Sequence, residues 1–362
     1  MQSWINFLEQ QGARFATPPS LAIEVFADGP NADAPPFTNF MAPLTEYGLI
    51  AATGADAASF LHNQLTNDVE KLDAAQARLA GYCTPKGRLM ATFLVWKSGE
   101  SILLQLPSAL LPALQKRLSM FILRAKAKLN DASTQQVQIG LAGPAAVTIL
   151  QQWFNDMPAK PYAVVHAAAG TLMRLADTAS IDDARAAGVA RYLWITDEGS
   201  AQAAWPQLRA VLQPAGADAW YLSDIRAGVP VITGPTQEQF VPQMINFEAV
   251  GGVNFQKGCY PGQEIVARSQ YLGKLKRRMM PATVASATVA AGSEVFSSAD
   301  PTQACGMVVN AAPNAPGSSA CLVEIKLAAL DASVHLDTID GPMLTFHALP
   351  YALSDADRPD LR

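Results

Sequence analysis

The 362-residue chain has little cysteine, little histidine and little charge, and each shortage excludes a class of protein. An extracellular disulfide scaffold of this length would carry more cysteines. The four that are present include no CxxC pair: Cys83, Cys259, Cys305 and Cys321. We therefore expect reduced thiols and a cytoplasmic location. The four histidines are widely separated and show no zinc-ligand spacing, so we predict no metal site.

Long apolar runs and a surplus of positive charge are also missing. Only 16% of the residues are charged and the formal net charge is −5, which disfavours broad, non-specific nucleic-acid binding. The alanine-rich stretch near 163–176 is interrupted by His166 and Arg174, so no membrane span is predicted. The first residues place Trp4, Ile5 and Leu8 at helical spacing, which predicts a helix, and they lack the features of a signal peptide. Half of the residues are hydrophobic, so the chain should fold, and its length favours two or three domains.

Helical and strand patterns are interleaved without regular βαβ alternation, which favours an α+β fold. Turn signals at Pro85–Gly87 and Ser98–Gly99 separate strands expected between residues 78 and 106. Asp56 is a candidate N-cap for a helix through Leu65. Beyond residue 280 the composition changes to Gly, Ala, Ser and Val, with turn clusters at 311–319 and 339–342. This last part is predicted to form a small β-barrel.

One eight-residue segment, Lys257 to Glu264, reads KGCYPGQE and concentrates the chemical signals. Gly258, Pro261 and Gly262 indicate a turn around Cys259, and a helix could begin at Glu264. A thiol beside Lys257 and just before a helix lies in a field that favours the thiolate. The alternative is that Cys259 is a small buried apolar group and that the glycines only shape the turn. The residues alone leave both interpretations open.

KGCYPGQE matches, at every fixed position, the signature K-G-C-[FY]-x-G-Q-E of the YgfZ-type folate-binding proteins. The chain is similar to that family in further segments: TGADAASFLHNQLTNDV, AGVPVI, VARSQYLGKLKRR and LPYAL. The resemblance covers most of the chain from about residue 44, more loosely in the C-terminal part. The family is described as tRNA-modifying, is linked to iron–sulfur cluster assembly, and resembles the glycine-cleavage T-protein, an aminomethyltransferase, in fold. The signature positions here are Lys257, Gly258, Cys259, Tyr260, Gly262, Gln263 and Glu264.

The resemblance implies three domains in a ring around a central tetrahydrofolate site. It assigns 1–150 to a first T-protein-like region and 151–275 to a second region that carries the signature and is partly interwoven with the first. Residues 276–352 would form the barrel and 353–362 a frayed tail. Tyr47 and Trp220 stand where relatives place aromatic residues that line the folate cavity, although ordinary core packing is the alternative for both.

Two departures from the family pattern bear on chemistry. Ala91 and Thr92 align with the acidic pair of the transferase, and neither can act as its base, so classical aminomethyl transfer is not expected. Arg226 stands where relatives commonly carry a glutamate that contacts the pterin edge. We expect Arg226 to contact folate in another way, through the anionic tail or a different folate form.

A basic cluster follows the signature: Arg268, Lys274, Lys276, Arg277 and Arg278. Such a cluster could bind polyglutamate or dock tRNA or a partner protein, and a solvated linker is the alternative. The net negative charge weakens the interpretation as a direct tRNA contact.

The leading hypothesis is a tetrahydrofolate-binding accessory protein that supports iron–sulfur cluster assembly or repair and thereby tRNA methylthiolation. Cys259 would be its essential thiol. A cluster normally needs four ligands, so any cluster would be transient and shared with a partner, either an assembly protein or an iron–sulfur client enzyme. We expect a monomer. The alternatives are a folate-dependent one-carbon transferase or demethylase, and an interaction scaffold with a vestigial folate cavity.

Overall fold

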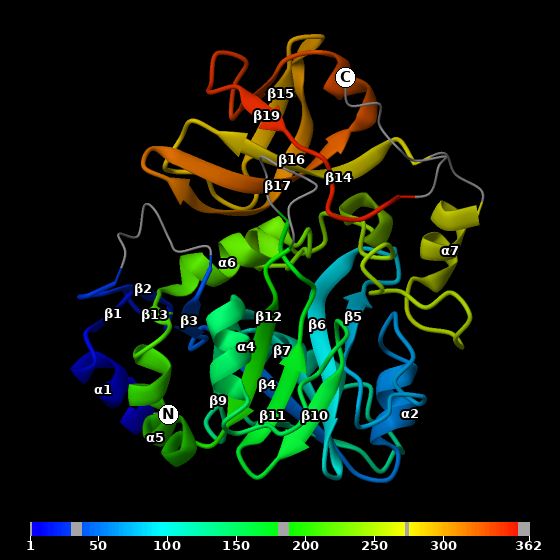
Figure 1. Ribbon diagram of the computed structural model, residues 1–362. Coiled ribbons are helices and arrows are strands. Elements are labelled where there is room, and N and C mark those ends of the chain that lie inside the picture. The colour runs from blue at the N-terminus through cyan, green and yellow to red at the C-terminus, as the bar shows by residue number, and fades with distance from the viewer. Residues whose placement is uncertain (1, 30–37, 180–187, 272–274, 354–362) are drawn as a thin grey trace.

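The computed structural model describes residues 2–29, 38–179, 188–271 and 275–353. Two sheets lie side by side, and a barrel of strands sits across one end of them, at the top of Figure 1. The predicted tail at 353–362 lies outside the described residues except for its first residue. No helix in the described ranges combines the length and apolar character needed to cross a bilayer.

The chain begins with a short helix and a two-stranded ribbon, α1 (Gln2–Gln10), β1 (Ala13–Phe15) and β2 (Ile23–Phe26). Helix α1 buries Trp4, Ile5 and Leu8, which confirms the helical spacing read from the sequence. Trp4 and Leu8 belong to a hydrophobic cluster on the outer side of the six-stranded sheet described below.

A five-stranded antiparallel sheet has the order β5-β6-β7-β4-β8. Its strands are β4 (Tyr47–Thr53), β5 (Arg78–Cys83), β6 (Leu89–Ser98), β7 (Ser101–Pro107) and β8 (Lys128–Asp131). The two predicted turns, at 85–87 and 98–99, do separate β5, β6 and β7. One face packs against α2 (Ala57–His62) and α3 (Leu111–Ser119), which follows the short 3-10 turn η1 (Ser108–Leu110).

The predicted cap of α2 differs in detail. Asp56 stands at the N-cap position but makes no side-chain capping bond. Its Oδ2 instead accepts a hydrogen bond from the Lys126 amide at 2.6 Å, and the helix ends at His62 rather than at Leu65. A tertiary contact has therefore replaced the local cap.

A second, six-stranded sheet has the order β10-β11-β12-β9-β3-β13. Its strands are β3 (Phe40–Pro43), β9 (Val137–Ala142), β10 (Val164–Ala167), β11 (Gly170–Arg174), β12 (Arg191–Thr196) and β13 (Gln213–Pro214). The helices that follow its strands are α4 (Pro144–Leu150), α5 (Glu198–Arg209) and α6 (Ala217–Arg226). Side chains of α4 and α5 share the outer cluster with α1, whereas α6 lies at the end nearer the barrel (Figure 1).

The six-stranded sheet draws on strands that are far apart in the sequence. β3 pairs antiparallel with β9 and parallel with β13, so residues near 40, 140 and 213 lie in adjacent strands. β3 and β9 come from the first predicted region and β10 to β13 from the second. Strands from both predicted regions therefore share this sheet, while the division into two interwoven T-protein-like regions with a boundary at residue 150 stays a prediction.

The C-terminal sheet has the order β18-β15-β16-β17-β14-β19 and comes close to closing on itself through a bridge between His335 and Met343. Its strands are β14 (Arg277–Val284), β15 (Glu294–Ser297), β16 (Asp300–Ala315), β17 (Ser318–Lys326), β18 (Val334–Leu336) and β19 (Leu344–Phe346). The predicted barrel is confirmed. The turn expected over 311–319 is shorter, because β16 runs to Ala315 and pairs with β17 through this stretch.

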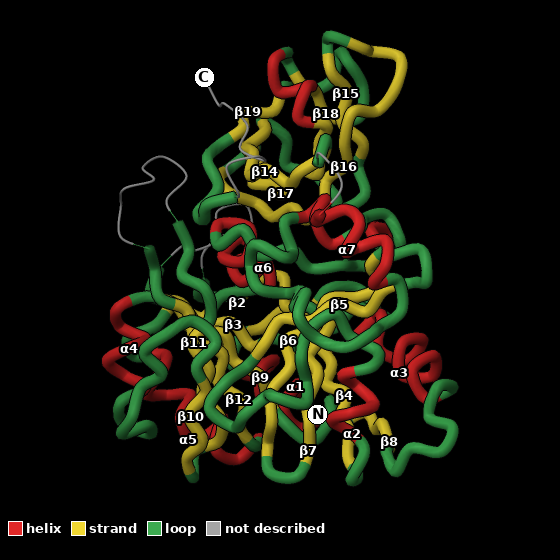
Figure 2. Tube along the Cα trace, turned by 90° about the vertical axis from the view of Figure 1, so that its right-hand side faces the viewer, coloured by secondary structure: helices red, strands yellow, loops and turns green. Residues whose placement is uncertain are grey.

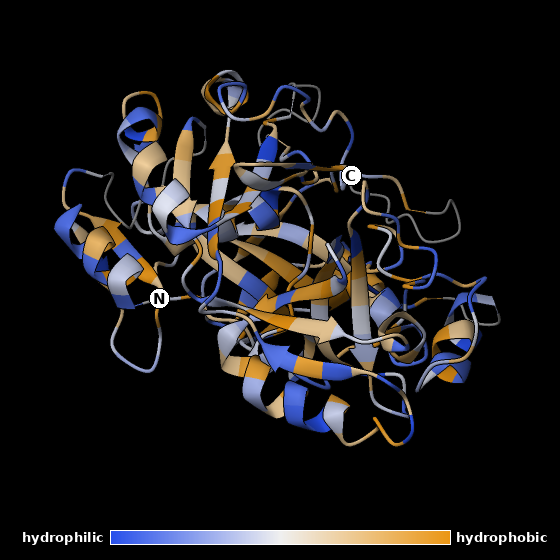
Figure 3. Ribbon diagram, turned by 90° about the horizontal axis from the view of Figure 1, so that it is seen from below, coloured by the Kyte–Doolittle hydropathy of each residue, from blue (hydrophilic) through white to orange (hydrophobic). Residues whose placement is uncertain are grey.

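The main core lies where the three sheets meet. One hydrophobic cluster contains Leu49 and Trp96 from the first sheet, Leu193 from the second, and Val309 and Leu322 from the barrel. Figure 2, turned by a quarter, shows the barrel above the two sheets from the side. In Figure 3 the strands are mainly hydrophobic, whereas the outer helices carry hydrophilic stripes. The remaining elements are η2 (Gly234–Thr236), η3 (Pro242–Ile245), α7 (Gln263–Tyr271) and η4 (Leu327–Asp331).

Candidate functional site

Two adjoining cavities lie where the sheets, α6 and the barrel come together. The inner cavity has a volume of about 60 Å³ and the outer chamber about 730 Å³. They share a boundary of four lining residues: Tyr47, Pro107, Asp224 and Val231. The barrel contributes part of the outer wall, including Asn310 and Ala311. The outer chamber is large enough for a drug-sized ligand, whereas the inner cavity is not.

Tyr47 is held in place by a polar network that joins the two large sheets. Tyr47 begins β4, opposite Pro107 at the end of β7. Gln138 on β9 donates to the Tyr47 carbonyl at 3.0 Å and accepts a hydrogen bond from Gln105 on β7 at 2.7 Å. Both glutamines are buried. Polar side chains in these otherwise apolar strands (LLQLP and VQIG) are a signal that the sequence reasoning did not use.

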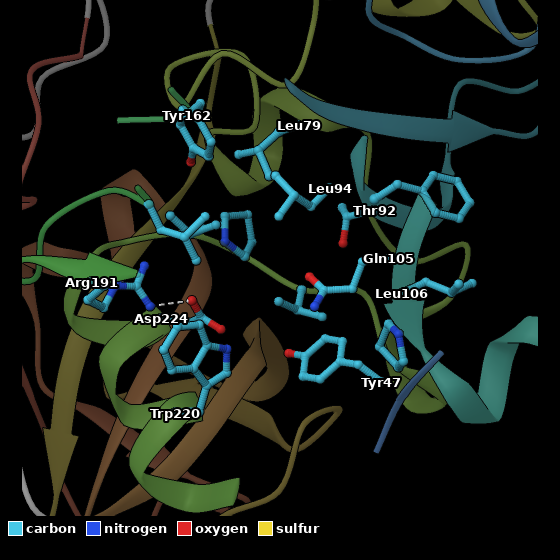
Figure 4. A pocket seen from close by; sticks show the side chains of 16 residues that line it. Tyr47, Leu79, Thr92, Leu94, Gln105, Leu106, Tyr162, Arg191, Trp220 and Asp224 are labelled. Atoms are coloured by element: carbon cyan, nitrogen blue, oxygen red, sulfur yellow. Dashed lines mark hydrogen bonds and ion pairs between the residues drawn. The ribbon is translucent and has the colours of Figure 1, made fainter. Parts of the chain in front are cut away.

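The inner cavity contains a buried ion pair beside Trp220 (Figure 4). Arg191 Nη1 lies 2.6 Å from Asp224 Oδ1, and the guanidinium also donates to Ser223 Oγ at 2.8 Å. The same guanidinium lies over the Trp220 ring, 5.2 Å from its centroid. Burial raises the pKa of Asp224, and the charge and hydrogen bonds of Arg191 oppose that rise.

Trp220 itself is only 3% exposed. A Cβ built on Gly140 of β9 would come within 2.4 Å of its ring, so the indole lies directly on the strand backbone there. With Arg191 over the ring as well, Trp220 borders the inner cavity as a packed side chain. Its contact with folate stays a prediction. Tyr47 borders both cavities, and Tyr47 and Tyr221 are the aromatic residues among the described lining of the outer chamber.

Thr92 and Ala91 lie on opposite faces of β6, as alternate strand residues must. Thr92 borders the inner cavity, and its hydroxyl accepts a hydrogen bond from the Ile232 amide at 3.1 Å. Ala91 is fully buried in the cluster on the other face, with α2 and α3. The position that faces the cavity therefore carries a hydroxyl that cannot act as a carboxylate base.

The outer chamber is acidic. Glu46 and Asp224 are among its lining residues, and no lysine, arginine or histidine is among those that the structure describes there. Arg226, predicted to contact folate, borders neither described cavity. Its Nη2 donates to Asn314 Oδ1 of β16 at 2.7 Å, so this side chain joins α6 to the barrel. Sequence reasoning missed Glu46 because nothing local marks it as buried.

The signature segment forms a loop that ends in α7. Lys257 is 8% exposed, its Nζ donates to the Gly258 carbonyl at 3.1 Å, and it lies 4.7 Å from the centroid of the Tyr260 ring. Burial lowers the pKa of Lys257 to about 8. Gly262 has φ +80°, and a Cβ there would come within 2.4 Å of the Thr84 carbonyl. The loop is therefore fitted closely against the β5–β6 turn, which is why a glycine is required.

Cys259 is exposed, whereas Cys83, Cys305 and Cys321 are buried. The structure thus answers the question left open by the sequence: Cys259 is not a buried apolar group. Of the remaining signature positions, Glu264 is exposed and Gln263 half-buried, both in the first turn of α7.

A histidine and two acids lie next to the signature loop. A Cβ on Gly258 would lie 3.5 Å from His62 Nε2. His62 Nδ1 is 3.1 Å from Asp68 Oδ1 and 4.0 Å from Glu70 Oε2. Both acids also act electrostatically on Lys257. The residue before Cys259 therefore lies beside the His62–Asp68 pair, which sequence reasoning did not connect with the thiol.

A third cavity of about 380 Å³ lies between this region and the centre. It is bordered by Asp68, Asn254 and Gln256, and it shares Leu79 and Tyr162 with the inner cavity. Tyr162 has φ +64°, an unusual conformation for a residue with a large side chain. Leu79 and Tyr162 thus separate the central cavity from the side of the molecule that carries the signature.

The described residues of the predicted basic cluster differ in burial and in their partners. Arg278 is 2% exposed, pairs with Glu248 and donates to the Gln243 carbonyl at 2.9 Å. Arg277 pairs with Glu324, with Nη2 3.0 Å from Oε2. Lys274 lies outside the described residues, and only Arg268 and Lys276 of the other four are exposed. Tertiary ion pairs have taken up two of the five predicted cations.

Residues 41–180 match the family model for the GCVT N-terminal domain. The tRNA-modifying protein YgfZ of Yersinia pestis (strain Pestoides F) is 31% identical over 255 residues, which cover 69% of this chain and 74% of that protein. YgfZ of Colwellia psychrerythraea (strain 34H) is 32% identical over 241 residues, covering 66% and 70%. The chain belongs to the YgfZ family.

The fold of this YgfZ-family chain is that of the T-protein. The glycine cleavage system aminomethyltransferase T from Bartonella henselae superposes with a TM-score of 0.75 at 16% identity, over 98% of this chain and 97% of that one. The prediction of a T-protein-like α+β fold with a C-terminal barrel is therefore confirmed.

Proposed function

We propose that this YgfZ-family protein binds tetrahydrofolate or a derivative in its central cavity and supports iron–sulfur cluster assembly or repair. Through that role it would sustain tRNA methylthiolation by iron–sulfur enzymes. The observation that carries the proposal is the exposure of Cys259, the signature thiol, on a loop fixed by Lys257 and Gly262. A small apolar group would be buried there, whereas a thiol that reacts with a partner must be accessible.

The outer chamber supports the folate half of the proposal. Its volume, the Tyr47 ring on its wall and the buried carboxyl of Glu46 suit a ligand with a flat ring and polar edges. Bound folate would supply one-carbon or redox chemistry, and the chain's part is to hold the ring and exclude water. Thr92, in place of an acid, weighs against aminomethyl transfer.

The cluster half of the proposal requires a partner. Among the described residues, no group of three or more His, Cys, Asp or Glu side chains is placed to hold a metal ion. One thiol supplies a single ligand of the four that a cluster normally needs. An assembly protein, a client enzyme or glutathione would have to supply the others, so Cys259 would act in transfer or repair rather than as a permanent ligand.

The test is complementation of a deletion strain, with tRNA methylthiolation as the readout. Cys259→Ser should fail to restore the modification while the purified variant binds tetrahydrofolate as the wild type does. Cys305→Ser changes a buried thiol in the barrel and should complement. Full complementation by Cys259→Ser would remove the thiol from the mechanism.

Two further results separate the alternatives. Turnover of a one-carbon folate by the purified protein would favour a transferase or demethylase. Tetrahydrofolate binding can be measured by tryptophan fluorescence, because Trp220 borders the inner cavity. Absence of any binding would favour a scaffold with a vestigial cavity.

A further inference from the structure

Three large hydrophobic side chains are exposed together on the loop that joins α3 to β8. Leu123 is 87% exposed, the highest value among the large hydrophobic residues that the structure describes, and Met120 and Phe121 are exposed beside it. Single exposed hydrophobic residues are common on protein surfaces, but three within four positions form a patch, and such patches mark interaction sites. We call these three side chains the apolar patch. None of them borders a cavity described above.

Hydrogen bonds hold the loop that carries the apolar patch. The amides of residues 120–122 donate to carbonyls three or four residues back in α3, at 3.0 to 3.2 Å. At the other end of the loop, the Lys126 amide donates to Asp56 Oδ2 at 2.6 Å, and the Lys126 carbonyl accepts from the Asp56 amide at 3.1 Å. Ile122 packs against the core beneath α2 and α3, while its two neighbours along the chain stay exposed. The patch therefore belongs to a well-anchored loop.

Positive charge surrounds the apolar patch. Between Glu100 and Asp131 the sequence has no acidic residue, although the chain as a whole has a net charge of −5. Five cations lie in this stretch, all exposed except the half-buried second one: Lys116, Arg117, Arg124, Lys126 and Lys128. No ion pair joins them to any residue in the described ranges. The first two lie in the last turn of α3, where they stabilise the helix dipole, but the other three lie beyond the helix.

Helix α2 places the apolar patch near Cys259. Asp56, at the N-terminal end of α2, holds Lys126 of the loop, and His62, the last residue of the helix, lies beside Gly258 of the signature segment. The helix has six residues, so its two ends are about 9 Å apart. Figure 2 shows α2, α3 and α7 in the right half of the view. One protein bound over the patch can therefore also reach the Cys259 thiol, which is exposed.

The chemistry of this surface favours a protein over RNA or a membrane. Methionine, phenylalanine and arginine are enriched at protein interfaces. Bases of single-stranded RNA stack on aromatic rings, and the apolar patch has one ring among its three side chains. Binding in a membrane surface typically uses an amphipathic helix, whereas residues 120–127 form an irregular loop. The surrounding cations call for a negatively charged surface opposite them, because complementary charges guide association and suppress wrong partners.

We propose that residues 116–128 are a docking surface for an acidic protein partner. The partner places an apolar pocket over the apolar patch and aspartate or glutamate side chains against the surrounding cations, and it thereby comes within reach of Cys259. This inference rests on the proposed function and adds the chemistry of the partner, which is a negatively charged assembly protein or client enzyme. Association through such a surface is fast at low salt and slows as salt screens the charges.

Complementation at limiting expression tests the docking surface, with tRNA methylthiolation as the readout. Met120→Asp and Leu123→Asp each place a negative charge in the apolar patch, so each should lower the modification on the order of 10-fold. Met343→Asp is the matched control, because Met343 is an exposed methionine just before β19 of the barrel, and it should complement fully. The purified variants should keep the thermal transition and the Cys259 labelling rate of the wild type.

Overexpression separates a loss of docking from a loss of the thiol. Higher concentration should restore methylthiolation in Met120→Asp and Leu123→Asp, because these variants lose affinity alone, whereas Cys259→Ser should stay inactive at every level. A photo-crosslinking amino acid then identifies the partner in complemented cells. The same acidic protein should be captured from position 123 and from position 256, an exposed position just before the signature segment, and not from position 343.

Four results would overturn the inference. Full complementation by both aspartate variants at limiting expression would remove the docking surface and leave the role of Cys259 standing. Capture of different proteins, or of none, at positions 123 and 256 would have the same meaning. Binding of the purified chain to tRNA, or to vesicles of phosphatidylglycerol and phosphatidylcholine in equal parts, that is lost in Leu123→Asp would assign the surface to RNA or to a membrane. Complementation by Cys259→Ser would overturn both proposals.

Discussion

Arg191 and Asp224 form a buried ion pair, 2.6 Å from Nη1 to Oδ1, that places a guanidinium over the Trp220 ring. Arg191 comes from β12 and Asp224 from α6, so the pair ties this helix to the six-stranded sheet. The Arg191 side chain is 1% exposed and that of Asp224 13%. This buried pair therefore holds α6, which lines the cavity, against the six-stranded sheet. Removal of one partner would leave the other charge buried without a counter-ion.

Asp224→Asn should therefore destabilise the protein strongly. We expect the free energy of unfolding to fall by about 3 kcal/mol or more, because Arg191 would keep its charge without a counter-ion. The control is Asp177→Asn, which breaks the Arg174–Asp177 pair (2.8 Å), whose aspartate is 39% exposed. That change should cost about 1 kcal/mol or less. Urea unfolding measures both, and similar small losses would contradict a structural role for the Arg191–Asp224 pair.

Gly140→Ala should disturb the same wall from the opposite side. A Cβ at this position would come within 2.4 Å of the Trp220 ring, so the indole or β9 must move. We expect a loss of about 1–3 kcal/mol in the free energy of unfolding, as for other overpacked cores. Gly234→Ala is the control, because a Cβ there meets nothing within 4 Å. Equal stability of the two variants would show that Trp220 is not packed on Gly140.

The elements that could be predicted are those with local causes. Turn residues at 85–87 and 98–99 separated β5, β6 and β7, and Trp4, Ile5 and Leu8 identified the helical stripe of α1. The fold and the family were predicted from the resemblance carried by the signature around Cys259. Helix and strand propensities do not account for that signature. Interweaving of β3, β9 and β13 depends on contacts between distant segments and could be expected only through the resemblance.

The candidate site was harder to predict from the sequence, because the sequence does not show which residue a charged side chain will pair with. Arg277 and Arg278 were predicted to belong to a basic patch. In the structure Arg277 pairs with Glu324 and Arg278 pairs with Glu248. Arg226 was predicted to contact folate, whereas in the structure its guanidinium donates a hydrogen bond to Asn314. In each case the partner is at least 30 residues away along the chain. Glu46 is the converse, because the sequence did not single it out and the structure buries it.

Thiol labelling should separate Cys259 from the other cysteines. An aromatic disulfide reagent should modify one thiol rapidly in the native protein and four in denaturant, because Cys83, Cys305 and Cys321 are buried. Burial also raises the pKa of Cys83 and Cys321 to about 12, which suppresses their thiolates further. Cys259→Ser should abolish the rapid phase. A rapid phase that persists in this variant would mean that another thiol is accessible.

The Glu46 carboxyl should also make the free energy of unfolding depend on pH. Its pKa is about 8 in the folded protein against an ordinary value of 4.5, because burial penalises the charged form. Below about pH 4.5 both folded and unfolded chains hold the proton, and Glu46 does not destabilise the fold. Between pH 4.5 and 8 the unfolded chain releases a proton that the folded chain retains, so the free energy of unfolding falls as pH rises.

Glu46→Gln removes this titration. As pH rises from 5 to 8, the free energy of unfolding of the variant should therefore increase relative to that of the wild type, by roughly 3–5 kcal/mol at most. Other groups, including Asp218 with its pKa raised to about 6 by burial, titrate in both proteins and cancel in the comparison. Glu100→Gln, on an exposed turn, should follow the wild type throughout. Urea unfolding at several pH values gives the difference directly. Parallel curves for wild type and Glu46→Gln would mean that the carboxyl ionises as readily in the folded protein as in the unfolded chain.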